Sequence, residues 1–237
     1  MPKYKTEIKD VVEETWDVKT FRLQKPDFKF LPGQYGLFSF PDKPEFKGES
    51  RPFTFSNSPT DEKLEITVKK MGDFTTALHE AKLGERLEFE GPMGEKLNFN
   101  ERVKENVFFI AGGSGITPFM SAIRYAKAKK LPNKITLLFS NRRQEDTIYK
   151  GELDGLNGGN LKVVYTLSDK TPKDWKGETG RIDRAMVEKH VREPKGCLWY
   201  LCGPPPMMSA MKKMLSNMEI PKDKIRIEDW QLPGKND

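Results

Sequence analysis

The sequence Val-Phe-Phe-Ile-Ala-Gly-Gly-Ser-Gly-Ile-Thr-Pro, at residues 107–118, decides how the second half of this chain folds. Its first four residues are all apolar, which is typical of a strand buried on both faces of a parallel sheet. The glycines that follow let the backbone turn sharply and approach a ligand closely. Pro118 suits the first turn of a helix, where its missing N–H leaves no hydrogen bond unmade. The stretch therefore predicts a strand, a tight turn and a helix whose N-terminus attracts a pyrophosphate.

A regular alternation of strands and helices continues after this stretch. Apolar runs predict strands at residues 107–110, 135–140, 161–167, 197–202 and 224–228. Helical periodicity predicts helices at residues 119–130, 147–156, 183–191 and 205–218. Buried strands that alternate with helices indicate an α/β domain with a parallel sheet of the nucleotide-binding type. A tight turn that binds no ligand is the alternative for residues 112–118, and this context disfavours it.

The first half of the chain has a different pattern, with short strands between glycine and proline turns. We expect strands at residues 5–12, 18–23, 35–40, 51–56, 64–70 and 86–90, and one helix at 74–81. Six short strands at this spacing predict an antiparallel six-stranded β-barrel. The pattern changes near residues 100–105, so we expect one domain over residues 1–103 and a second over residues 104–237.

The composition excludes several classes of protein and site. No run of about 18 apolar residues occurs, so we expect no membrane span. The N-terminus lacks an apolar signal segment, which favours the cytoplasm. Cys197 and Cys202 form no C-x-x-C pair, which excludes a disulfide framework and a four-thiolate iron–sulfur cluster within this chain. His79 and His190 lie far apart in the sequence, and we expect no metal site.

The charge is unevenly distributed along the chain. Residues 1–103 carry 17 basic and 19 acidic side chains, a net charge of −2, whereas residues 104–237 carry 24 and 16, a net charge of +8. We therefore expect the second half to meet anions, with a solvated lysine-rich surface as the alternative. No cluster of basic residues interleaved with aromatic ones occurs, so nucleic acid is not an expected partner.

A second glycine turn follows the apolar run at residues 197–202. Ligands of such sheets bind beyond the carboxyl ends of the strands, so Cys202 is expected at that edge, beside a cofactor bound at residues 113–117. A buried structural cysteine is the alternative, because free cysteines are among the most buried residues. The sequence alone leaves both open.

One segment of the first half combines three useful side chains. Arg51 suits bidentate binding of a phosphate, Phe53 offers a flat ring, and Thr54 offers a hydroxyl group. On its own this segment is only an alternating strand.

Taken together and in their order, five motifs resemble those of the ferredoxin–NADP reductase-like superfamily, over almost the whole chain. They are Arg51-Pro52-Phe53-Thr54, Gly72-Asp73-Phe74-Thr75, Gly113 to Pro118, Cys202-Gly203-Pro204-Pro205 and Glu228-Asp229-Trp230. The resemblance implies a flavin-binding barrel at residues 1–103 and an NAD(P)H-binding α/β domain at 104–237. It also implies an NAD(P)H-dependent flavoprotein oxidoreductase.

The resemblance implies a role for each matched residue. In the barrel, Arg51 holds a flavin phosphate, Pro52 follows it in the cofactor-binding motif, Phe53 packs on the isoalloxazine, and Thr54 bonds its N5; Gly72, Phe74, Thr75 and Thr76 form a second phosphate turn. In the second domain, Gly113, Gly115, Thr117 and Pro118 hold the dinucleotide pyrophosphate, and Cys202, Gly203 and Pro204 form the nicotinamide pocket. Thr54, Cys202 and Glu228 are the catalytic candidates, and Trp230 lies close to the flavin. Phe53 departs from the tyrosine usual in this family, so a hydroxyl group is missing there.

The identity of the cofactors and partners is the last expectation. The second phosphate turn favours FAD, with FMN as an alternative. Arg142 and Arg143, with Arg181 and Arg184 as further candidates, favour NADPH over NADH because an arginine can bind a 2′-phosphate. Electrons are expected to leave to a separate one-electron carrier such as an acidic ferredoxin or flavodoxin. The alternatives are an NAD(P)H:flavin reductase that uses flavin as a substrate, and the reductase subunit of a larger electron-transfer complex.

Overall fold

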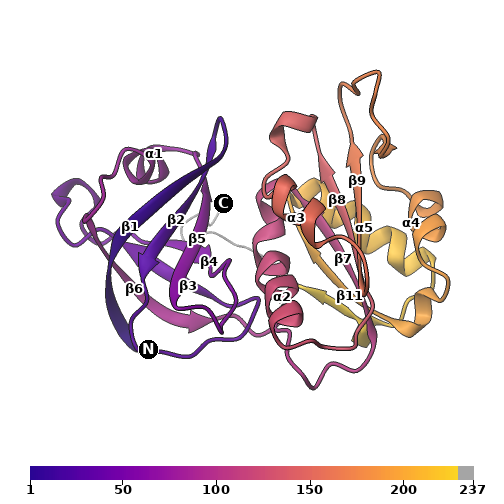
Figure 1. Ribbon diagram of the computed structural model, residues 1–237, viewed down its shortest axis with the longest axis horizontal. Coiled ribbons are helices and arrows are strands. Elements are labelled where there is room, and N and C mark those ends of the chain that lie inside the picture. Colours follow the sequence, from indigo (N-terminus) through magenta and orange to yellow (C-terminus); the bar gives the residue numbers. More distant parts are fainter. Residues whose placement is uncertain (229–237) are drawn as a thin grey trace.

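The computed structural model describes residues 1–228, and they form two sheets of six strands each (Figure 1). The antiparallel sheet contains β1 (Lys3–Thr15), β2 (Val18–Gln24), β3 (Tyr35–Ser39), β4 (Arg51–Thr54), β5 (Lys63–Lys69) and β6 (Arg86–Met93). The other sheet is parallel and contains β7 (Asn106–Gly112), β8 (Ile135–Asn141), β9 (Leu161–Leu167), β10 (Glu178–Thr179), β11 (Cys197–Cys202) and β12 (Ile225–Ile227).

Helices accompany both sheets. The α-helices are α1 (Asp73–His79), α2 (Thr117–Ala128), α3 (Lys150–Leu156), α4 (Arg184–His190) and α5 (Pro205–Asn217). Short 3₁₀ turns are η1 (Pro44–Phe46), η2 (Gly113–Ile116), η3 (Gln144–Asp146), η4 (Pro194–Gly196) and η5 (Lys222–Lys224). Among residues 1–228, no helix combines the length and the apolar character that crossing a bilayer requires.

The antiparallel sheet closes into a barrel. Its strand order is β4-β3-β6-β1-β2-β5, and a backbone bridge between Phe55 and Ile66 brings the two outer strands together. The Ser56 N–H donates to the Glu65 carbonyl oxygen at 2.8 Å at the same seam. Phenylalanine fills most of the interior, at positions 21, 28, 30, 38, 40, 46, 55, 74 and 89. The predicted six-stranded antiparallel barrel is confirmed.

The parallel sheet is covered on both faces because successive residues of its strands point to opposite sides. Phe109 packs with α2 and α3 on one face, and Phe108 packs with α4 and α5 on the other. Figure 1 shows α2 on the side of this sheet that faces the barrel. Leu97 and Phe99, which precede the expected domain boundary, pack in the same core as Phe109. The predicted α/β fold is confirmed, and the boundary at residue 103 stays a prediction.

The order of the parallel strands reverses at one place. The sheet reads β10-β9-β8-β7-β11-β12, so the chain moves outward from β7 to β10 and then returns to the other side of β7. Ligands of such sheets bind outside the carboxyl ends of the strands, where this reversal leaves a crevice. The gap between the ends of β7 and β11 is therefore the expected place for a dinucleotide.

Candidate functional site

The glycine-rich loop lies at the carboxyl end of β7, as the sequence predicted. The strand ends at Gly112, a 3₁₀ turn follows, and α2 begins at Thr117 with Pro118 in its first turn. Gly113 has a φ of +52°, a conformation that side chains disfavour, and the space beside its Cα is open. The Thr117 hydroxyl donates to the Ser114 carbonyl oxygen at 3.1 Å and closes the turn. The loop thus presents the start of a twelve-residue helix to the reversal point.

Two glycines allow this loop to touch the turn that follows β11. A Cβ on Gly115 would collide with the carbonyl group of Cys202 and would lie 2.7 Å from the Gly203 nitrogen. A Cβ on Gly112 would lie 2.5 Å from the Met207 sulfur. Cys202 itself is buried and lies opposite the end of β7 in the sheet. The structure therefore brings together the two second-half motifs, which are about ninety residues apart in the sequence.

Glu228 reaches from the end of β12 to the barrel. A side chain at Gly94 would come within 3.0 Å of both the Glu228 carboxylate and the Tyr35 ring. One oxygen of that carboxylate, Oε2, is buried and has no hydrogen-bond partner among the described residues. Burial raises the pKa of Glu228, although the charge of Lys96 opposes the shift. Burial and the Glu228 charge raise the pKa of Tyr35 as well.

The proximity of Glu228 to the barrel places the predicted catalytic residues in one region. Tyr35 lies opposite Thr54 in the register of β3 and β4, and Thr54 is buried. Leu201 lies opposite Ile227, so Cys202 and Glu228 follow neighbouring strand ends. The sequence reasoning did not identify Tyr35 or Gly94 as site residues. The sequence pattern predicts Tyr35 only as the start of a strand, and no local signal marks its proximity to Glu228.

Arg51 lies beside the first turn of α1. Its guanidinium donates to the Glu49 carboxylate at 2.7 Å and to the Ser50 carbonyl at 2.9 Å, and it lies 5.4 Å from the centre of the Phe74 ring. The Phe53 ring lies 6.3 Å from that of Phe74. Pro52, between them on β4, is half-buried. The two barrel motifs, about twenty residues apart in the sequence, therefore meet in space.

The turn at the start of α1 forms hydrogen bonds within itself. Gly72 has a φ of +80° and open space beside its Cα. The Thr75 hydroxyl accepts from the Met71 N–H at 2.6 Å and donates to the Gly72 carbonyl oxygen at 3.1 Å. That hydroxyl is therefore engaged within the turn, and Thr76 is the less buried of the two threonines.

The carboxyl end of β8 carries the two arginines that favoured NADPH. Both are exposed, and the Arg143 guanidinium lies 3.9 Å from Glu145 and 3.8 Å from Asp169, which are long ion pairs. Two buried polar atoms nearby, Nδ2 of Asn141 and Oγ1 of Thr147, have no hydrogen-bond partner among the described residues. An unsatisfied amide and hydroxyl at this edge are suited to bind a polar ligand.

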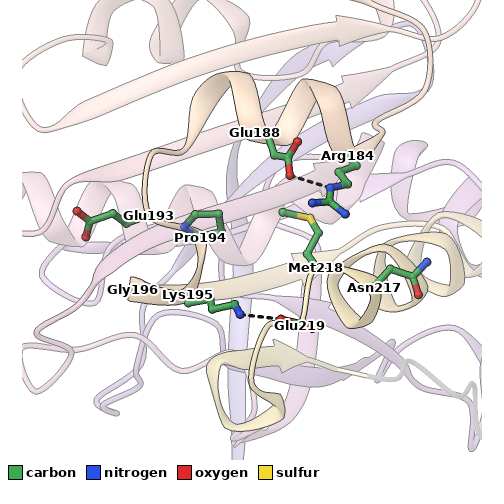
Figure 2. Close-up of a pocket in the computed structure, with 9 residues that line it drawn as sticks. All are labelled: Arg184, Glu188, Glu193, Pro194, Lys195, Gly196, Asn217, Met218 and Glu219. Atoms are coloured by element: carbon green, nitrogen blue, oxygen red, sulfur yellow. Dashed lines mark hydrogen bonds and ion pairs between the residues drawn. The ribbon is translucent and has the colours of Figure 1, made fainter.

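A surface depression shown in Figure 2 lies elsewhere, beside α4, η4 and the end of α5. Four of its charged side chains form two pairs: Arg184 donates to Glu188 at 2.7 Å, and Lys195 lies 2.9 Å from Glu219. Arg184 therefore lies in this depression and not at the end of β8. The depression adjoins the amino end of β11, opposite the edge that carries Cys202.

Two family models match this chain, and together they span residues 3–213. An FAD-binding domain matches residues 3–118, and an oxidoreductase NAD-binding domain matches residues 109–213. NADH-cytochrome b5 reductase 2 of Pyricularia oryzae is 31% identical over 232 residues, which cover 92% of this chain and 68% of that protein. The chain belongs to the ferredoxin–NADP reductase-like superfamily.

Other members of this superfamily are similarly close. The glycine betaine monooxygenase reductase subunit of Chromohalobacter salexigens is 31% identical over 220 residues, which are 87% of this chain and 58% of that protein. The solved ferredoxin reductase in carbazole 1,9a-dioxygenase aligns with a TM-score of 0.84 and 27% identity, covering 97% of this chain and 70% of that one. The chain spans about half to two thirds of the length of the curated relatives it matches.

Membership in the superfamily confirms the predicted class, an NAD(P)H-dependent flavoprotein oxidoreductase with FAD. The residues present fit both cofactors. The open loop at Gly113 and the unsatisfied Asn141 and Thr147 suit a dinucleotide, and the exposed side of Arg51 suits a phosphate. Trp230 lies outside the described residues, so its place beside the flavin stays a prediction.

Proposed function

We propose that this chain takes hydride from NADPH or NADH onto FAD and passes the electrons singly to a separate carrier protein. One observation carries the proposal: the Gly115 loop touches the Cys202 turn at the reversal point of the sheet, and the Glu228 carboxylate, at the end of the strand beside that turn, lies next to Gly94 at the end of a barrel strand. A dinucleotide bound at that point lies against the barrel that matches an FAD-binding domain.

In the barrel, we assign the flavin phosphates to Arg51 and to the turn at Gly72, Phe74, Thr75 and Thr76. Arg51 would exchange its exposed Glu49 partner for a phosphate, a stronger bidentate acceptor. Phe53 and Thr54 would orient the ring system, with Pro52 fixing the backbone immediately before them. When bound, FAD supplies both the acceptance of a hydride and the release of single electrons.

In the second domain, we assign the pyrophosphate to Gly113, Gly115, Thr117 and Pro118. Cys202, Gly203 and Pro204 would form the wall of the nicotinamide pocket. Glu228 would hold a proton near the reacting rings, since its burial favours the neutral carboxyl group. We also propose that residues 1–103 are the flavin domain and residues 104–237 are the dinucleotide domain.

The choice between NADPH and NADH depends on the end of β8. Arg142 and Arg143 support NADPH, because both are exposed and could bind a 2′-phosphate. The Glu145 and Asp169 carboxylates beside Arg143, and the NADH in the name of the Pyricularia relative, support NADH. An Arg142→Ala/Arg143→Ala double variant tests this choice through the NADPH/NADH ratio of kcat/KM. A ratio equal to that of the wild type would contradict the NADPH preference.

For the electron acceptor, we propose an acidic one-electron carrier such as a ferredoxin or flavodoxin. The net charge of +8 on residues 104–237 supports it. The relatives' names mention cytochrome b5 and a monooxygenase, so the acceptor differs within the superfamily. A reductase subunit of a larger complex is the second candidate, because the Chromohalobacter relative is named as the reductase subunit of a monooxygenase.

The decisive experiment is an absorbance spectrum of the purified protein, before and after anaerobic addition of NADPH or NADH. We expect flavin bands near one flavin per chain that bleach when the dinucleotide is added. Little bound flavin would replace the proposal with an enzyme that uses flavin as a substrate, for which the missing hydroxyl at Phe53 would be one cause. Bound flavin that neither dinucleotide reduces would refute the proposed donor.

A further inference from the structure

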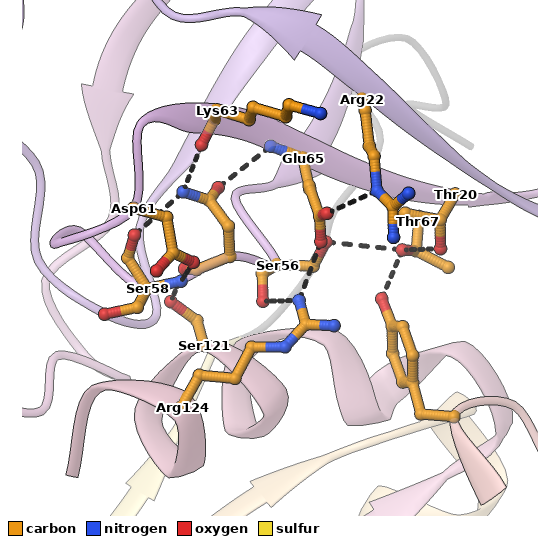
Figure 3. Close-up of polar contacts among 12 residues, drawn as sticks. Thr20, Arg22, Ser56, Ser58, Asp61, Lys63, Glu65, Thr67, Ser121 and Arg124 are labelled. Carbon is orange, nitrogen blue, oxygen red and sulfur yellow. Dashed lines mark hydrogen bonds and ion pairs between the residues drawn. The ribbon is translucent and has the colours of Figure 1, made fainter. Parts of the chain in front are cut away.

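A polar network joins the barrel to helix α2, away from the candidate site itself. Arg124, on α2, donates from Nη1 to the Ser56 carbonyl oxygen at 2.9 Å and to the Glu65 carboxylate at 2.8 Å (Figure 3). From Nε and Nη2 it donates to Glu152 on α3 at 2.8 and 2.6 Å. One mostly buried guanidinium therefore holds a barrel strand, a barrel loop and two helices together.

Tyr149 is the second member of this network. Its ring lies 5.2 Å from the Arg124 guanidinium carbon, and its hydroxyl bonds the Thr67 hydroxyl of β5. The Tyr149 N–H donates to the Glu14 carboxylate of β1 at 3.0 Å. Burial raises the pKa of Tyr149 to about 12, so the phenol keeps its proton. We call Arg124 and Tyr149, with their barrel partners Ser56, Glu65 and Thr67, the interdomain clasp.

The backbone of Tyr149 is unusual. Its φ of 57° and ψ of 16° lie in the left-handed region, which a residue with a large side chain rarely adopts. In this conformation the residue directs both its N–H and its hydroxyl to the barrel. Such conformations persist only where the surroundings fix them, and they concentrate at functional places.

The clasp connects the two cofactor motifs through short, rigid segments. Ser56 and Asn57 lie two and three residues after Thr54, at the end of the flavin motif. The Ser121 hydroxyl donates to the Asn57 carbonyl oxygen at 2.6 Å, and Ser121 is in the same helix as Arg124. That helix begins at Thr117 of the dinucleotide loop. A shift of α2 against residues 56–57 would therefore change the separation of the two motifs directly.

We propose that Arg124 and Tyr149 are positioning residues that set the separation of the flavin and dinucleotide motifs for hydride transfer. The proposal rests on the proposed function, because it assumes that hydride passes between these motifs. Rates of such transfers depend steeply on geometry, and a misplacement of about 1 Å can slow a reaction about 100-fold. Among residues 1–228, the hydrogen bonds of Arg124 and Tyr149 go to residues that are not predicted to bind a cofactor, so loss of the clasp should leave both cofactors bound.

The test compares two clasp variants with two matched controls in anaerobic stopped-flow reduction of the flavin. Tyr149→Phe removes only a hydroxyl, and Arg124→Met keeps the volume while losing the ion pairs. Tyr165→Phe removes a hydroxyl that bonds Asp154 within the second half, at 2.8 Å. Arg86→Met breaks an ion pair with Asp42 within the barrel, at 2.6 Å, and neither residue belongs to the clasp.

We expect the limiting rate of flavin reduction to fall about 10- to 100-fold in each clasp variant. The dinucleotide concentration at half-saturation and the bound flavin should change less than about twofold, and both controls should keep the wild-type rate. Unchanged limiting rates in folded clasp variants, or an equal loss in the controls, would overturn the positioning role alone. A wild-type protein that neither dinucleotide reduces would overturn the proposed function instead. Thermal unfolding of each variant identifies any loss of rate that is caused by misfolding. If Arg124→Met fails to fold, Tyr149→Phe, which keeps the ring, tests the positioning role by itself.

Discussion

The reversal point of the sheet leaves no room for a side chain at Gly115. A Cβ there would collide with the Cys202 carbonyl group, and neither partner is a flexible side chain. We expect Gly115→Ala to separate the two turns and to slow flavin reduction about 100-fold at a fixed, subsaturating dinucleotide concentration. The flavin should stay bound, because the barrel is not touched. Stopped-flow absorbance measures both quantities.

Gly155→Ala is the control for this substitution. Gly155 lies in α3 with open space beside its Cα, so alanine meets nothing there. In a helix interior, alanine should raise the free energy of unfolding by about 0.5–1 kcal/mol and leave the reduction rate alone. Equal rates for both alanine variants would mean that the close approach at Gly115 is not required.

Glu228 leads to a prediction about pH. Burial raises the pKa of its carboxyl group above the ordinary value of 4.5. Between 4.5 and the raised pKa, the folded protein binds the proton and the unfolded chain has lost it, so the free energy of unfolding falls as pH rises. Glu228→Gln cannot ionise and lacks this fall. Urea unfolding between about pH 4 and pH 8 should show the variant gaining stability relative to wild type as pH rises. Parallel curves would refute this.

At the scale of elements, the sequence predicted most strands and helices because their patterns are local. Alternation along β5 and the continuous apolar run of β7 each place a strand within about two residues of the observed bounds. The strand β10 was not predicted, since two residues carry no period. Its pairing with β9 is decided by the fold, through the backbone of Thr166 and Leu167.

Contacts between distant elements were the part that local patterns could not supply. The motifs indicated that Arg51 and Phe74 serve one cofactor, yet only the closed barrel brings the guanidinium over that ring. Likewise Tyr35 and Glu228 both lie beside Gly94 because two separate sheets approach each other. The family motifs predicted each candidate residue separately. Which residues contact it depends on how distant elements pack together.

Helix α1 provides a prediction at this scale. Phe74 is buried and packs against the rings of Phe40, Phe46 and Phe53. Phe74→Ala should lower the free energy of unfolding by about 3–5 kcal/mol, because it leaves a cavity between α1 and the barrel. It should also weaken flavin binding, since Arg51 loses the ring beneath it. Chemical denaturation and flavin absorbance measure the two effects. Leu83→Ala, which removes an exposed side chain after α1, should change stability by less than about 0.5 kcal/mol.

At the scale of the whole molecule, the two halves differ in charge while they share one interface. The barrel half is nearly neutral in net charge, at −2, and the half with the parallel sheet carries +8. The interdomain clasp involves only one basic side chain, Arg124, which forms ion pairs with Glu65 and Glu152. Most of the excess positive charge therefore remains available to steer an anionic partner.

This asymmetry predicts how salt affects electron delivery. Exposed charges more than about 10 Å apart are screened at about 0.1 M salt. We expect the pre-reduced protein to transfer electrons to an acidic ferredoxin or flavodoxin about tenfold more slowly at about 0.5 M than at about 0.05 M salt. A basic c-type cytochrome is the matched comparison, because like charges repel and salt should then leave the rate unchanged or raise it. Stopped-flow mixing with each carrier measures the second-order rate constant. The same salt dependence for both carriers would mean that the +8 half does not face the acceptor, and the search would move to a partner that docks on the barrel.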